Sequence, residues 1–344
     1  MMPSTLPEPV LFHAGRGEPV LRWGILGTGW IAGEFAQALR AHTRQLVTAV
    51  GSRSQESADR FAAGFGVERA YASRAAFLDA PELDAVYVAS PPAEHLAEGL
   101  AAIAAGKHVL IEKPFATSAA DARKLVDAAR DAGVFVMEAM WSRYQPQSLI
   151  IRELLRDGVL GEIRSVRADL GQAINPGPEH RLSRPDLGGG ALLDMGIYPI
   201  QLDSMVRGTP ASIVATGGLA ESGVDAYATV LTGYRTGEQS VLTTSMITRT
   251  PAAAAICGSR ARIEIAAPFH APTGFILAGN DFGTDTTTWQ DETGIAGFGG
   301  LSWEATAFAG YVGEQRTESP LHPHGEMISI LATIDEARRQ LGAI

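Results

Sequence analysis

The sequence Glu112-Lys113-Pro114 places a lysine directly before a proline, at the end of an apolar run that begins at His108. A residue before proline is disfavoured in helical geometry, so we expect Lys113 to be extended at the end of a strand. An ammonium group fixed there can polarise a hydroxyl or a carbonyl group. An exposed lysine at the start of a loop is also common and usually inert, and the spacing alone does not separate these alternatives.

A second group of polar residues follows the triple glycine Gly188-Gly189-Gly190. The run from Ala191 to Val206 predicts a helix that Pro199 should kink. Asp194 and Tyr198 are four residues apart and should therefore share one face of it. A carboxylate and a phenol on an apolar helix are costly to bury unpaired. Either they form hydrogen bonds to loops, or Tyr198 exchanges a proton while Asp194 orients a substrate.

A glycine-rich turn follows an apolar, strand-like run from Leu21 to Leu26 and precedes a helical pattern. Its sequence has the G-x-G-x-x-A form of a dinucleotide-binding turn: Gly27 permits the tight turn, Gly29 lets the backbone approach a pyrophosphate, and Ala32 permits close helix packing. The free N–H groups of the helix start favour phosphate. The predicted cofactor-binding residues here are Gly27, Thr28, Gly29, Trp30 and Ile31.

The second predicted strand, 46–51, ends at Gly51-Ser52-Arg53-Ser54. An acidic residue that binds the ribose hydroxyls of NAD is usual at this place, and none occurs here. A guanidinium with two hydroxyls suits a 2′-phosphate, because arginine binds phosphate through two parallel charge-assisted bonds. We therefore favour NADP over NAD as the cofactor. Alternatively, Arg53 is a solvated loop residue and Ser54 only caps the helix expected at 55–65.

Strands and helices alternate with short connections up to about residue 145. This order predicts an α/β domain with a doubly wound parallel sheet, whose ligands bind beyond the carboxyl ends of the strands. Ser90, Pro91 and Glu112 lie at such ends together with Lys113, and we expect them to line the cofactor site. His95 could line the same cleft, although a lone helical histidine is more often packed or solvated.

Beyond residue 145 the pattern changes to strand-like stretches at 162–171, 211–220, 225–234 and 238–248, with shorter ones between 252 and 289. They predict an α+β domain with an open, mostly antiparallel sheet of about six strands. A final helix at 323–341 carries an apolar stripe. We therefore predict four parts: an N-terminal arm (1–20), a dinucleotide-binding domain (21–145), a substrate and oligomerisation domain (146–322), and a C-terminal helix packing back on the body (323–344).

The composition is that of a soluble globular protein: among 344 residues, 46% are hydrophobic and 19% are charged. The net charge of -10 comes without a basic stripe, which argues against a nucleic-acid partner. Runs of about 18 apolar residues are missing, which argues against a membrane span. The first residues show no basic leader, and the single cysteine, Cys257, cannot form an intrachain disulfide. We expect a cytoplasmic protein without a metal site.

Four stretches together, LRWGILGTGWIA, EKPFA, MEAMWSRYQP and GGGALLDMGIYP, resemble the glucose-fructose oxidoreductase / inositol dehydrogenase / rhizopine catabolism protein (Gfo/Idh/MocA) family. The resemblance covers essentially residues 20–341. It looks closest to the branch that contains dimeric dihydrodiol dehydrogenase and NADP-dependent D-xylose dehydrogenases. The EKP and GGG-x-x-x-D-x-G-x-Y-P motifs are specific when they occur together, whereas the glycine turn is not.

The resemblance implies a Rossmann domain followed by a domain whose open sheet commonly forms the oligomer contact, hence a homo-oligomer, which could be a homodimer or a tetramer. It implies that Lys113 lowers the pKa of the reacting hydroxyl, that Tyr198 donates or accepts the proton, and that Asp194 positions the substrate. It also implies a cis Lys113-Pro114 bond. Because Tyr198 stands where inositol dehydrogenases carry histidine, a cyclitol substrate becomes less favoured.

The expected activity is therefore NADP(H)-dependent hydride transfer to or from a carbinol carbon of a sugar or vicinal diol. Sugar hydroxyls need planar and polar neighbours, so the candidates for the substrate pocket are Trp141, Arg143, His180 and Arg181. Trp141 could instead belong to a domain interface. Two alternatives have the same fold: an NAD-dependent glycosidase that oxidises its sugar transiently, and a non-catalytic dinucleotide sensor. The combined presence of Lys113, Asp194 and Tyr198 argues against the sensor.

Overall fold

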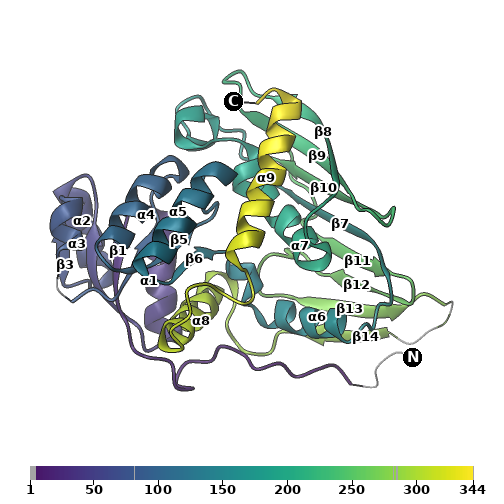
Figure 1. Cartoon of the computed structure of the whole chain (residues 1–344), viewed down its shortest axis with the longest axis horizontal. Coiled ribbons are helices and arrows are strands. Elements are labelled where there is room, and N and C mark those ends of the chain that lie inside the picture. The colour runs from purple at the N-terminus through teal and green to yellow at the C-terminus, as the bar shows by residue number, and fades with distance from the viewer. Residues whose placement is uncertain (1–4, 81, 282, 284–285, 344) are drawn as a thin grey trace. The chain divides into compact units, whose positions relative to one another are not determined.

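The computed structural model describes residues 5–80, 82–281, 283 and 286–343 (Figure 1). Its chain forms two compact units. The first, which we call the parallel-sheet unit, comprises 11–145 and 295–327. The second, which we call the mixed-sheet unit, comprises 146–294 and 328–344 together with the first ten residues, as far as these are described. Each unit is built around its own sheet.

The parallel-sheet unit contains a six-stranded sheet in the order β3-β2-β1-β4-β5-β6, with every described pair parallel. The order reverses between β1 and β4, which is where doubly wound sheets bind their ligands. The predicted Rossmann architecture is thus confirmed. The strands are β1 (Arg22–Leu26), β2 (Leu46–Gly51), β3 (Arg69–Tyr71), β4 (Ala85–Val88), β5 (His108–Glu112) and β6 (Val136–Ala139).

Helices cover both faces of this sheet, and strands such as β4 are buried along their whole length. In Figure 1, α4 and α5 lie side by side next to β5. Side chains of Ser54 and Ser118 cap α2 and α5 at their starts, and the left-handed glycines Gly66 and Gly133 end the same two helices. The helices are α1 (Trp30–His42), α2 (Gln55–Phe65), α3 (Arg74–Leu78), α4 (His95–Ala104), α5 (Ala119–Ala132) and α8 (Leu301–Gly313).

Helix α8 is an element that the sequence pattern did not reveal. Almost all its residues are buried, so it lacks the polar face that makes a surface helix recognisable. Its Phe308 ring lies 4.7 Å from the Trp23 ring of β1 and 4.9 Å from the Phe135 ring. These contacts explain why residues 295–322, which we had placed in the second domain, cluster with the parallel sheet instead.

The mixed-sheet unit contains an eight-stranded sheet in the order β14-β13-β12-β11-β7-β10-β9-β8. The pair β7 and β10 is parallel, and the other described pairs are antiparallel. The predicted open, mostly antiparallel sheet is confirmed, but the expected number of about six strands was too low. The strands are β7 (Ile163–Gly171), β8 (Ser212–Leu219), β9 (Asp225–Gly233), β10 (Gln239–Ser245), β11 (Ala254–Gly258), β12 (Ala261–Ile265), β13 (Gly274–Gly279) and β14 (Thr286–Gln290).

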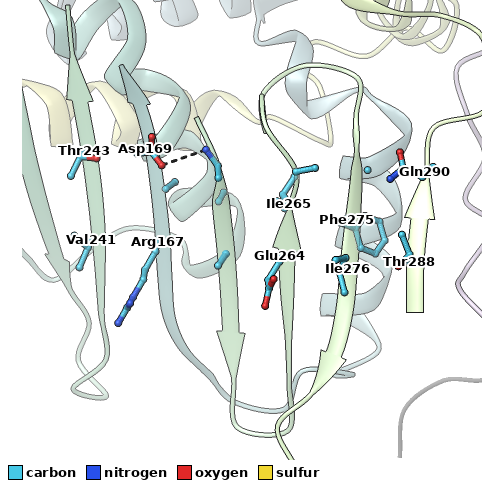
Figure 2. Close-up of a pocket in the computed structure, with 16 residues that line it drawn as sticks. Arg167, Asp169, Val241, Thr243, Glu264, Ile265, Phe275, Ile276, Thr288 and Gln290 are labelled. Carbon is cyan, nitrogen blue, oxygen red and sulfur yellow. Dashed lines mark hydrogen bonds between the residues drawn. The ribbon is translucent and has the colours of Figure 1, made fainter. Parts of the chain in front are cut away.

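One face of this sheet is packed by α7 (Ile197–Arg207), which contacts β7 and β10, while α6 (Pro146–Arg156) precedes the first strand. The other face, seen in Figure 2, carries outward-pointing side chains in register across the strands. Val241 pairs with Arg167, and Ile276 pairs with Glu264 on one side and Thr288 on the other. This outward face is built in the alternating pattern of a half-buried sheet.

The last helix, α9 (His324–Leu341), crosses the division between the two units within its first turns. Near its end, the Gln340 side chain bonds to the backbone of β8: its Nε2 donates to the Ile213 oxygen at 2.9 Å, and its Oε1 accepts from the Ala215 nitrogen at 2.7 Å. Gly342, with φ +70°, ends the helix. Within the described ranges, no helix combines the length and the apolar character that crossing a membrane requires.

Candidate functional site

The glycine turn lies at the carboxyl end of β1. Gly27 has φ +106°, and a Cβ there would lie 2.6 Å from the backbone oxygen of Ala89, so only glycine fits. Gly29 directly precedes α1 with φ -73°, and a Cβ there would meet nothing within 4 Å. Among the described residues, no side chain caps this helix start. The open space over Gly29 and the uncapped N–H groups fit a dinucleotide pyrophosphate.

Aromatic side chains border this turn. Trp30, the first residue of α1, is 63% exposed, and its ring lies 4.6 Å from the ring of Phe298. Phe298 in turn stacks on Trp141 at 5.5 Å. Trp141, a predicted substrate residue, is buried. The structure therefore joins predicted cofactor and substrate residues through Phe298, which no sequence pattern indicated.

The loop after β2 presents Arg53 to solvent, while the Ser52 backbone N–H bonds to the oxygen of Tyr71 at 2.9 Å. The Ser54 hydroxyl accepts a bond from the Ser57 N–H at the start of α2. The capping role considered for Ser54 is thus present. The exposed guanidinium of Arg53 stays available to a phosphate at this strand end.

His95 is fully buried and does not present its ring on a cleft surface. Its Nδ1 lies 2.8 Å from the Pro114 oxygen, and its Nε2 lies 2.9 Å from the Ser90 oxygen. Burial lowers the pKa of His95, while the two carbonyls oppose this shift. His95 therefore connects the loops after β4 and β5 through these two contacts. This agrees with the alternative that His95 is a packed residue.

Residues 112–115, which we call the Lys113 turn, follow β5 and contain the cis Lys113-Pro114 bond that the resemblance implied. The Glu112 carboxylate accepts a bond from the Lys113 N–H at 2.9 Å and another from the Tyr87 hydroxyl. Burial raises the pKa of Glu112, and Lys113 opposes this shift. Glu112 is buried, so it supports the turn, whereas the Lys113 side chain is half-buried.

In the mixed-sheet unit, Asp194 lies in a π-helical turn, Leu192–Gly196, that runs into α7. The helix expected from Ala191 to Val206 is present as an unbroken helical run, but Leu192–Gly196 form a wider π-helical turn where a uniform α-helix was expected. Pro199 follows this turn near the start of α7. Tyr198 is almost buried, with its ring 4.7 Å from that of His270.

The predicted substrate residues His180 and Arg181 are adjacent in the chain, and Arg181 contacts Asp194. The guanidinium of Arg181 pairs with the Asp194 carboxylate at 2.9 Å and is itself about half exposed. The exposed His180 accepts a bond from the Leu182 N–H and so caps a short helical turn. An arginine paired to a carboxylate on this surface can contact substrate hydroxyls.

Asp225 holds the start of the π-helical turn. Its Oδ2 accepts a bond from the Leu192 N–H at 2.6 Å, and a Cβ on Gly190 would lie 2.3 Å from its Oδ1. Burial raises the pKa of Asp225 to about 6, against the Leu192 bond and the charge of Arg338. Glycine is thus needed at position 190 so that the backbone can pass this carboxylate.

Arg143, also predicted to contact substrate, is fully buried in the parallel-sheet unit. Its guanidinium bonds to Glu326 at 2.7 Å and to the Leu321 oxygen at 3.2 Å. These bonds give Arg143 a structural role, and its contact with substrate stays a prediction.

Buried acids near the Lys113 turn were not among the predicted residues. Glu138 ends the apolar run of β6, so the rule that ligand residues follow parallel strands could have found it. Glu304 in α8 has no hydrogen-bond partner for either oxygen among the described residues. Burial and the charges of Glu112 and Glu138 raise its pKa.

A hollow of about 780 Å³ lies on the outward face of the mixed sheet (Figure 2). Arg167, Asp169, Glu264 and Ile276 line it, and apolar atoms make up most of its surface. None of the predicted catalytic or cofactor residues lines this hollow. It is therefore separate from the candidate site.

Comparisons with known proteins agree with this geometry. Residues 21–140 match the family described as an oxidoreductase family with an NAD-binding Rossmann fold, and residues 149–264 match the GFO/IDH/MocA C-terminal domain. The chain is 34% identical over 327 residues to trans-1,2-dihydrobenzene-1,2-diol dehydrogenase of Xenopus laevis, covering 94% of this chain and 98% of that relative.

Two solved structures have similar folds. The 3-ketoreductase KijD10 of Actinomadura kijaniata, in complex with NADP and TDP-benzene, has a TM-score of 0.80 at 28% identity, with 94% of this chain and 98% of that chain covered. Levoglucosan dehydrogenase, in complex with NADH and levoglucosan, has a TM-score of 0.84 with 94% and 97% covered. Its identity of 19% shows a shared fold alone.

Proposed function

Because the chain belongs to the GFO/IDH/MocA family of oxidoreductases, we propose that it interconverts a secondary alcohol and a ketone in a vicinal diol or sugar, with NADP(H) as cofactor. The observation that carries this proposal is the Lys113 turn. Its backbone is held by buried side chains at the carboxyl end of β5, in the same sheet whose β1 ends at the uncapped glycine turn. A bound nicotinamide supplies or accepts the hydride.

The chain's own residues then handle binding and the proton. We assign Lys113 to lower the pKa of the reacting hydroxyl and Tyr198 to accept or donate its proton. Asp194, paired with Arg181, orients the substrate, and Trp141 and His180 complete the proposed pocket. These roles require Lys113 and Tyr198 to meet at one nicotinamide ring. That convergence is the central prediction.

The choice of NADP rests on Arg53. The guanidinium is exposed beyond β2, where an NAD-binding domain usually carries a carboxylate. The other residues of the proposed cofactor site are Gly27, Thr28, Gly29, Trp30, Ile31, Ser52, Ser54, Ser90 and Pro91. The buried side chains of His95 and Glu112 support this site through hydrogen bonds to its backbone. The NADP named in the KijD10 structure is in keeping with this choice, whereas levoglucosan dehydrogenase was solved with NADH.

The name of the Xenopus laevis relative makes a trans-dihydrodiol the first substrate to test. Turnover of trans-diols, aldoses and ketoses should be followed by NADPH absorbance, with NADP and NAD side by side. A clear preference for NAD would contradict the role of Arg53. Copurifying NAD without turnover of added cofactor would favour the transient-oxidation glycosidase instead.

Replacing the amine provides the decisive variant. Lys113→Ala should abolish turnover and leave NADP affinity within about threefold, because the backbone of the cofactor turn is untouched. Lys107→Ala is the matched control, since Lys107 bonds to the Leu83 oxygen at the opposite end of β5. Turnover that persists in Lys113→Ala would remove Lys113 from the mechanism.

A further inference from the structure

Three consecutive residues of the Lys113 turn each have one backbone group held by a side chain. The Lys113 N–H donates to Glu112, the Pro114 oxygen lies 2.8 Å from His95, and the Phe115 N–H donates to Glu138 at 2.7 Å. Glu112 is the preceding residue in the chain, so its bond is local. Glu138 comes from β6, the neighbouring strand, and its bond fixes the turn relative to the sheet.

Glu138 is itself held in place. Its other oxygen lies 2.7 Å from His322 Nε2, and both side chains are almost completely buried. His322 Nδ1 lies 4.0 Å from Glu326, whose carboxylate pairs with the buried Arg143 at 2.7 Å. The 4.0 Å separation is longer than a hydrogen bond, so the hydrogen-bonded pairs here are Glu138 with His322 and Glu326 with Arg143. Hydrogen bonds to buried carboxylates restrict the movement of both side chains.

Buried polar pairs of this kind are weak support for stability, because the cost of desolvation offsets the attraction between the groups. Their other effect is to fix geometry. A carboxylate held on one oxygen by His322 can offer only one position to the Phe115 N–H. Together with the local bond from the Lys113 N–H to Glu112, the bond from the Phe115 N–H to Glu138 fixes the backbone on both sides of Lys113.

We propose that Glu138 is a positioning residue for the reaction: held by His322, it fixes the backbone that carries Lys113. The proposal rests on the proposed function for its effect on turnover, whereas its effect on the turn can be measured without turnover. Glu138 contacts the backbone of Phe115 and reaches no reacting atom in this role. A small displacement of a catalytic group can reduce turnover by about 10²-fold.

The test compares Glu138→Ala with Glu138→Gln in the full-length chain. Glutamine keeps an oxygen that can accept the Phe115 N–H, whereas alanine removes it. Glu304→Ala is the matched control, because it truncates another fully buried glutamate of the same unit that makes no hydrogen bond to the turn. The first readout is amide hydrogen exchange of a peptide containing Phe115, measured without cofactor.

We expect exchange at Phe115 to be at least about tenfold faster in Glu138→Ala and near wild type in Glu138→Gln and Glu304→Ala. The kcat for the best diol or sugar should fall by about 10²-fold in Glu138→Ala and recover in Glu138→Gln. NADP affinity, measured by titration, should stay within about threefold, because the glycine turn is unchanged.

Unchanged exchange in Glu138→Ala, or a kcat loss no larger than that of Glu304→Ala, would overturn the proposal. If Glu138→Ala does not fold, His322→Ala provides the second test. This variant keeps the Glu138 carboxylate, which accepts the Phe115 N–H bond, but removes the His322 bond that holds the carboxylate in place. The amide exchange rate at Phe115 should therefore rise, and a wild-type exchange rate would again overturn the proposal. A wild-type chain without any turnover would refute the proposed function, while the exchange readout would still decide whether Glu138 fixes the turn.

Discussion

At the scale of single residues, several buried titratable side chains hold the backbone of nearby turns through hydrogen bonds. Glu112, Glu138 and His95 hold the Lys113 turn, and Asp225 holds the turn that precedes Tyr198. Each is buried, so each pays a desolvation cost that a neutral residue would avoid. Burial raises the pKa of Glu112 and of Asp225 and lowers that of His95, so these three groups make stability pH-dependent, and Asp225 offers the clearest case.

The pKa of Asp225 is raised to about 6, so the folded chain binds its proton more tightly than the unfolded chain does. Its contribution to stability is largest below about pH 4 and is lost as the pH rises to about 6, by roughly 3 kcal/mol in total. Asp225→Asn keeps an oxygen for the Leu192 N–H and removes this titration. Relative to wild type, the variant should gain stability between about pH 4 and about pH 7.5.

Urea unfolding of both proteins at the two pH values measures this gain. The comparison with Asp225→Asn removes the contributions of other acids, because these titrate equally in both proteins. A difference in unfolding free energy that is the same at both pH values would show that Asp225 does not titrate in this range.

At the scale of elements, the two glycines of the turn between β1 and α1 have different roles: we expect Gly27 to affect folding stability and Gly29 to affect cofactor binding. Gly27 is fixed by its positive φ and by the backbone of Ala89, whereas Gly29 has a φ open to any residue and free space around it. Gly27→Ala should therefore destabilise the chain by more than about 1 kcal/mol. Gly29→Ala should leave stability within about 0.5 kcal/mol.

The same Gly29→Ala methyl group would occupy the path by which the backbone approaches a pyrophosphate. We expect NADP affinity to fall by at least about tenfold, equivalent to about 1.4 kcal/mol. Thermal unfolding without cofactor and fluorescence titration with NADPH measure the two effects. Unimpaired affinity in a folded Gly29→Ala protein would mean that the dinucleotide binds elsewhere.

At the scale of the whole molecule, the outward face of the mixed sheet is the proposed oligomer contact. Ile276 is exposed in the lining of the hollow of Figure 2, and the exposed Leu231 pairs in register with Val241 of the same lining. Exposed apolar patches of this kind often mark protein interfaces. Ile276→Lys should shift the wild-type oligomer to a monomer in light scattering, because an ammonium group would have to lose its hydration inside an apolar contact.

Ile247→Lys changes an equally exposed isoleucine that lies outside the strands, and it should leave the oligomer intact. If both variants keep the wild-type mass, the oligomer contact lies on another surface. If the wild-type protein is itself monomeric, the outward face does not mediate self-association.

The sequence alone determined the parallel sheet, the glycine turn and the exposed antiparallel sheet, because each depends on local patterns: strand-helix alternation, glycines at fixed spacing and alternating polarity. The ranges expected at 46–51 and 55–65 coincide with β2 and α2. Other features were beyond such patterns. Helix α8 is buried on nearly all sides and shows no stripe, and the π-helical turn before Tyr198 depends on Asp225, more than 25 residues further along the chain.

Only the tertiary structure decided which partners these polar residues have. The predicted site residues His95, Glu112 and Arg143 are buried and hydrogen-bonded within the fold, and their contact with cofactor or substrate stays a prediction. Glu138 and His322 are 184 residues apart in the chain and share one hydrogen bond. The physical reason is that the burial and the long-range hydrogen bonds of a residue depend on which distant segments of the chain pack against it. The spacing of residues within one short stretch does not contain this information.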